Sequence, residues 1–158
     1  FRRVLFRSRV IGMKEASGDR EHSIEIWKKL HKKTSIIVAG MSSQTYYEAY
    51  PYGVSGYFVG SGNAIPKISL DIYELIQKGD IQTAKELIDT QELPFLREAK
   101  KLGWHAAIKG TLHEMGIMSK VERPPMVSCD DEGLAKLRSI IESCGWLDKS
   151  NSSLYASL

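Results

Sequence analysis

Residues 10–19 read VIGMKEASGD, a short apolar run that ends at Lys14 and leads into a polar turn. This order predicts a β-strand, a loop and then a helix with Asp19 as its N-cap. Residues 20–33 follow with apolar side chains at helical spacing and lysines in the last turn. The stretch therefore predicts a strand–loop–helix unit, in which Lys14 lies at the carboxyl end of the strand.

The same unit is repeated twice further along the chain. Residues 35–39, SIIVA, form a continuous β-branched run, which predicts a strand buried on both faces. A third strand is expected at 54–59, with helices at 43–50 and from Pro66 to Gly79. Alternation with short links predicts right-handed βαβ units and a parallel sheet.

The rest of the chain has only helical patterns. Helices are expected at 81–102 with a kink at Pro94, at 104–115, and after the N-cap Asp130. Three strands followed by three helices make a poor complete α/β domain, because the edges of the small parallel sheet stay open. We therefore expect 9–149 to be the C-terminal part of a larger α/β domain and 150–158 to be a polar tail.

Composition excludes several classes of protein. The 158 residues are 42% hydrophobic and 26% charged, which is typical of a globular protein in solution. No apolar run approaches the roughly 18 residues of a membrane span, so we expect no membrane partner. Cys129 and Cys144 form no CxxC pair, which favours a reducing, cytoplasmic location.

The basic character of the chain resides in its first residues. Residues 1–8, FRRVLFRS, resemble the conceptual translation of a sequencing adaptor, so we interpret them as a non-native scar and not as a basic arm. Their three arginines equal the whole net charge of +3. The remaining basic cluster, around Lys28 and Lys32, fits the solvated face of a helix. A non-catalytic binding domain, with this cluster as its binding face, is the alternative to an enzyme. Because a solvated helix face explains the lysines, we expect no nucleic-acid partner.

Lys14 is the strongest candidate for chemistry. Ligands bind at the carboxyl ends of parallel strands, and alternation would place Lys14 and Gly12 on one face with Met13 on the other. In the interior of a barrel, partial desolvation would disfavour the ammonium and leave a neutral amine able to attack a ketone. From position alone, a solvated lysine at a strand end remains the alternative.

Motifs in a fixed order carry a resemblance to a known family. They are GMKEASGD at 12–19, AGM at 39–41, GYFV at 56–59, GNAIP at 62–66, AIK at 107–109 and RPPM at 123–126. Together they resemble the dihydrodipicolinate synthase / N-acetylneuraminate lyase family of class I aldolases over about residues 10–147. The resemblance implies a partial (β/α)8 TIM barrel, its last three βα units, followed by a C-terminal helical layer.

The resemblance also implies roles for three residues. Lys14 is similar to the family's Schiff-base lysine at the end of the sixth strand. Gly40 resembles the glycine that ends the seventh strand beside the substrate, and Phe58 lies where the eighth strand offers its backbone to the keto acid. A plain turn glycine and a barrel-core phenylalanine are the alternative interpretations.

The implied activity is a lyase reaction on pyruvate-type 2-keto acids through a lysine imine, with no metal and no organic cofactor. A 2-keto-3-deoxy sugar-acid aldolase or dehydratase, or an N-acetylneuraminate lyase, fits the same residues. The resemblance implies a homo-oligomeric parent protein. The family's first five strands are missing here, so we expect this chain alone to be inactive.

Overall fold

The computed structural model describes residues 10–146, and the chain divides at Gly60 into two compact units. The adaptor-like segment 1–8 and the tail 150–158 lie outside the described residues.

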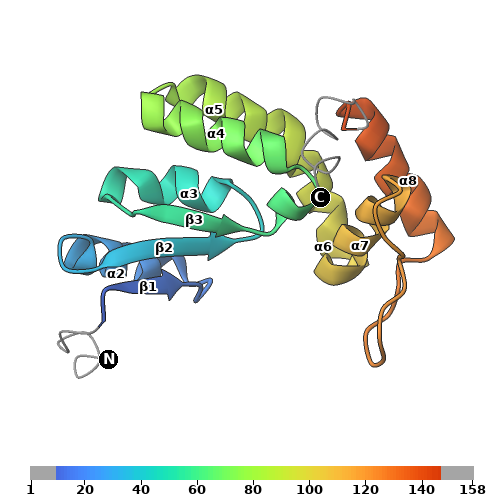
Figure 1. Ribbon diagram of the computed structural model, residues 1–158, viewed down its shortest axis with the longest axis horizontal. Coiled ribbons are helices and arrows are strands. Elements are labelled where there is room, and N and C mark those ends of the chain that lie inside the picture. The colour runs from blue at the N-terminus through green and yellow to red at the C-terminus, as the bar shows by residue number, and fades with distance from the viewer. Residues whose placement is uncertain (1–9, 147–158) are drawn as a thin grey trace. The chain divides into compact units, whose positions relative to one another are not determined.

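The first unit is built on a three-stranded parallel sheet with the order β1-β2-β3 (Figure 1). The strands are β1 (Gly12–Glu15), β2 (Ser35–Gly40) and β3 (Gly56–Val59). Helix α2 (Arg20–Leu30) connects β1 to β2, and α3 (Gln44–Ala49) with a 3-10 turn (Tyr50–Tyr52) connects β2 to β3. The predicted mixed α/β architecture is confirmed.

Helix α2 begins where the sequence predicts. The side chain of Asp19 accepts a hydrogen bond from the backbone N–H of His22 (3.1 Å), which satisfies one of the free donors of the first turn. The helix buries Ile26 and Trp27 and exposes Lys28 and Lys29. The strand, loop and cap of residues 10–19 therefore form as one local unit.

The two faces of the sheet differ sharply in exposure. Ile36 and Val38 are fully buried on one face, whereas Ile37 is 43% exposed and Phe58 is 66% exposed on the other. The prediction that 35–39 is buried on both faces is therefore wrong for this chain. The reason is that the described helices of this unit, α2 and α3, pack on the buried face, where Tyr46 of α3 stacks on Tyr57 of β3 (ring centroids 4.7 Å apart).

In its described residues, 61–146, the second unit consists of helices and loops without a strand. A 3-10 turn (Ser61–Asn63) precedes the following elements: α4 (Pro66–Lys78), α5 (Ile81–Leu87), the π-helical turn η3 (Ile88–Glu92), α6 (Leu93–Leu102), α7 (Trp104–Glu114) and α8 (Asp131–Ser143). Asp130 caps α8 by accepting from the N–H of Gly133 (2.8 Å), as the sequence predicts. Among the described residues, no helix has the length and apolar content to cross a membrane.

The irregularity expected at Pro94 is a widened turn just before it. Pro94 has no N–H to donate to the carbonyl of Thr90, and the π-helical turn accommodates this gap. The Cys144 thiol lies 3.7 Å from that carbonyl and donates to it. The break in the helix is therefore stabilised by a side chain from 54 residues further along the chain.

Phe95 lies at the centre of the aromatic core of this unit. It is fully buried, and its ring meets those of Trp104 and Trp146 edge to face, at centroid distances of 5.9 and 5.7 Å. Edge-to-face aromatic pairs add stability beyond the burial of their surface.

We therefore predict that Phe95→Ala lowers the free energy of unfolding by about 3–5 kcal/mol, because it leaves a cavity between two tryptophans. Urea unfolding followed by tryptophan fluorescence measures the loss. Leu70→Ala is the control, since Leu70 is 52% exposed and should shift stability by no more than about 0.5 kcal/mol. Equal losses in the two variants would contradict this account of the core.

Candidate active site

The three residues singled out in the sequence lie at or near the carboxyl ends of neighbouring strands. Lys14 is the third residue of β1, Gly40 the last of β2 and Phe58 the third of β3. Lys14 pairs with Ile37, and Ala39 pairs with Phe58. Because the strands are parallel, these ends meet at one edge of the sheet, where α/β proteins bind ligands.

Lys14 and Phe58 share the exposed face of the sheet. Alternation along β1 exposes Gly12 and Lys14 and buries Glu15, in agreement with the predicted pattern. The Lys14 ammonium lies over the Phe58 ring, 4.6 Å from its centroid. The expected desolvation of Lys14 is absent in this chain, because its side chain is exposed.

Gly40 lies where the backbone of β2 meets α3 and the end of β3. Its carbonyl accepts a hydrogen bond from the N–H of Gly60 (3.1 Å). A Cβ at Gly40 would overlap Oγ1 of Thr45 and lie 3.0 Å from Cβ of Thr45. The close approach of Thr45 therefore favours glycine at position 40, in addition to any requirement of a turn.

Glu15 follows Lys14 and is the last residue of β1. Its side chain is buried and points to the face opposite Lys14. Its carboxylate accepts hydrogen bonds from the backbone N–H (2.8 Å) and hydroxyl (2.5 Å) of Ser17 and from the hydroxyl of Ser23 in α2 (2.8 Å). The network ties the end of β1 to the first turn of α2.

These contacts control the ionisation of Glu15. Burial by itself raises the pKa of its carboxyl, but the hydrogen bonds from Ser17 and Ser23 outweigh it and leave the pKa below its ordinary value. The side chain is therefore an anion held by neutral donors. The sequence signal was the spacing of Glu15, Ser17 and Ser23, which places two hydroxyls beside one strand end.

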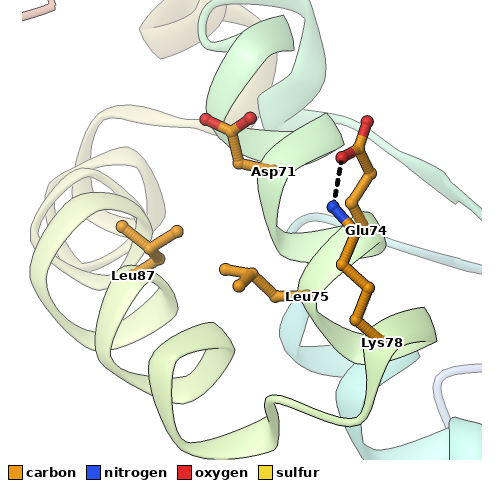
Figure 2. A pocket seen from close by; sticks show the side chains of 5 residues that line it. All are labelled: Asp71, Glu74, Leu75, Lys78 and Leu87. Carbon is orange, nitrogen blue, oxygen red and sulfur yellow. Dashed lines mark hydrogen bonds and ion pairs between the residues drawn. The ribbon is translucent and has the colours of Figure 1, made fainter.

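A separate pocket lies between α4 and α5 of the second unit (Figure 2). It has a volume of about 280 Å³ and is lined by Asp71, Glu74, Leu75, Lys78 and Leu87. Its carboxylates are paired, Asp71 with Lys67 (2.7 Å) and Glu74 with Lys78 (3.0 Å). None of the residues singled out in the sequence lines it.

No three metal-ligating side chains of the His, Cys, Asp or Glu type gather anywhere in residues 10–146. The chemically distinctive group of the first unit is the amine of Lys14, which lies over the Phe58 ring. It projects from a strand end that the Glu15–Ser23 hydrogen bond ties to α2. The first unit is therefore a parallel α/β unit with an accessible amine at the carboxyl end of its sheet, the edge at which α/β proteins bind ligands.

The chain belongs to the dihydrodipicolinate synthetase family, whose model matches residues 1–144. Curated relatives include a protein of Rhizobium rhizogenes named "Probable 5-dehydro-4-deoxyglucarate dehydratase", 33% identical over 138 residues. That match covers 85% of this chain and 45% of the relative. A protein of the same name from Pseudomonas putida is 29% identical over 139 residues, with 86% and 46% covered.

Solved structures share the fold. Dihydrodipicolinate synthase of Thermotoga maritima superposes with a TM-score of 0.78 at 18% identity, covering 92% of this chain and 50% of the other. N-acetylneuraminate lyase of Fusobacterium nucleatum gives a TM-score of 0.72 at 20% identity, with 86% and 45% covered. The chain therefore spans about half the length of the proteins it matches.

We predict that Gly40→Ala destabilises the first unit by about 1–3 kcal/mol, since the new methyl group would have to displace Thr45. Gly56→Ala is a matched control on β3, because a Cβ there meets no atom within 4 Å. Thermal unfolding of both variants measures the difference. An unchanged Gly40→Ala midpoint would refute the packing argument.

The lowered pKa of Glu15 predicts a specific dependence of stability on pH. The unfolded chain binds the proton more tightly than the folded one, so the stabilisation is complete above about pH 4.3 and is lost as pH falls through the lower folded pKa. Glu15→Gln should lower the free energy of unfolding by about 1–3 kcal/mol at pH 7. It should also reduce the fall in that free energy between pH 7 and pH 3. Urea unfolding between pH 3 and 7 measures this dependence, and Glu21→Gln, at an exposed position, is the control. If the unfolding free energy of Glu15→Gln depends on pH as that of the unaltered protein does, the assigned role of Glu15 is wrong.

Proposed function

We propose that the protein containing this chain is a Schiff-base lyase, and that Lys14 is its imine-forming residue. The observation that carries this is the Lys14 amine, exposed at the carboxyl end of a parallel sheet, in a GMKEASGD segment that resembles the family's Schiff-base segment. The three strands and their helices would supply the last three units of a (β/α)8 barrel. The likeness to solved family structures supports that placement.

The chemistry follows from the amine. In its neutral form Lys14 adds to the ketone carbon of a 2-keto acid. Loss of one water then forms a neutral C=N bond, and the imine nitrogen takes up one proton from solvent, replacing the one the ammonium had lost, and becomes positively charged. This cationic imine withdraws electrons from the neighbouring carbon, which allows a C–C or C–O bond to form or break there. The lysine thereby serves as the electron sink, a role that otherwise requires a cofactor.

Gly40 and Phe58 are the proposed substrate-binding residues. The packing of Gly40 against Thr45 brings backbone atoms to the strand end without a side chain in the way. Phe58 lies on the same face as Lys14. Because the chain spans 45% of its curated relative, we expect it to be inactive alone and active within a longer, cytoplasmic, homo-oligomeric protein.

The substrate has two leading candidates. Pyruvate is the simplest 2-keto acid that Lys14 could attack. The names of the R. rhizogenes and P. putida relatives favour a second candidate, the dehydration of 5-dehydro-4-deoxyglucarate. Both substrates require the same imine, so the proposed role of Lys14 is common to them.

We predict that borohydride reduction in the presence of either keto acid leaves a stable adduct on Lys14 of the full-length protein. Peptide mass mapping locates the adduct, and Lys14→Arg should abolish it. Lys28→Arg, which alters an exposed lysine of α2, is the control and should leave the adduct intact. An adduct on another lysine but not on Lys14 would refute the assignment. Comparing the consumption of pyruvate in the presence of an added aldehyde with the dehydration of 5-dehydro-4-deoxyglucarate identifies the reaction.

A further inference from the structure

The aromatic ring of Phe58 is the partner of the Lys14 amine on the exposed face. The two side chains come from the outer strands β1 and β3 and approach each other across β2, with Nζ 4.6 Å from the ring centroid. At 66% exposure, Phe58 is not held there by burial in a core. The resemblance to the family implies a role for its backbone only, so the ring is a separate feature of this chain.

No carboxylate of the described residues pairs with the Lys14 amine. Lys14 has no ion pair with any acidic residue among those described, 10–146. Its chain neighbour Glu15 points to the other face, where Ser17 and Ser23 occupy its oxygens. The electron-rich face of Phe58 is therefore the group that attracts the positive charge.

We propose that the Phe58 ring is a positioning residue, which holds the Lys14 nitrogen over the sheet and favours its cationic imine. This inference rests on the proposed function. The reaction joins the ammonium of Lys14 and the ketone, forms the C=N bond and releases one water and no net proton. Positive charge is thus present on the nitrogen before and after the reaction.

The ring should favour the imine over the ammonium because the two cations differ in hydration. The ammonium has three N–H donors and is strongly hydrated. The imine keeps one N–H, so water competes less with the ring for its charge. Cation–π attraction grows as the cation loses water. The equilibrium between the Lys14 ammonium and its cationic imine should therefore depend on the electron density of the ring.

The test varies that density while keeping the shape of the ring. Phe58 of the full-length protein is replaced by phenylalanine analogues with one, two and three ring fluorines, and the borohydride-trapped fraction is measured at subsaturating pyruvate. We expect the equilibrium constant for imine formation to fall stepwise, by about two- to fivefold over the series. Phe58→Leu should lower this equilibrium constant at least as much as three fluorines do. Phe58→Trp should leave it equal to or above that of the unaltered protein.

Tyr52→Leu is the matched control. The Tyr52 ring has the same kind of contact with an ammonium, that of Lys28 at 5.6 Å, within the same unit, so its loss should leave trapping unchanged. Unfolding midpoints check that each variant is folded. Trapping that stays constant or rises as fluorines are added would overturn this inference while leaving the role of Lys14 intact. The absence of any Lys14 adduct in the unaltered protein would overturn both.

Discussion

Parallel strand pairing is the constraint on which the first unit depends. Each parallel strand needs a crossover, so the chain returns to the same edge before the next strand begins, and the carboxyl ends of all three strands gather together. Both crossovers pack on one face of the sheet, through Ser23 against Glu15 and Tyr46 against Tyr57. Every other residue is thereby directed away from the helices. Lys14 and Phe58 share a face for this reason.

The same alternation separates two neighbouring charges. A carboxylate on the Lys14 face would favour the ammonium and reduce the nucleophilic form of the amine. Glu15 instead points toward α2, where hydroxyl and backbone donors stabilise its carboxylate, with a smaller electrostatic contribution from His22. Two consecutive residues therefore place an anchored anion on the covered face and, on the open face, an amine that has no ion pair within residues 10–146. The anchor fixes the strand end from which that amine projects.

Local patterns predicted most of the fold. The cap at Asp19, the cap at Asp130 and the positions of the three strands follow from short-range rules and appear in the structure. Long-range effects were not predictable. The widened turn before Pro94 depends partly on Cys144 far along the chain. The contact between Lys14 and Phe58 depends on strand register, which sequence spacing does not reveal.

The open face of the sheet connects the fold to the chemistry. Parallel sheets are ordinarily covered on both sides, whereas Ile37 and Phe58 are exposed in this chain, which spans about half the length of its relatives. A layer that buried Ile37 would also exclude water around Lys14. Exclusion of water disfavours the ammonium and strengthens the attraction between the ring and a cationic imine. We therefore expect that whatever covers this face in the full-length protein both completes the hydrophobic core and activates the amine, so that stability and reactivity have a single physical origin.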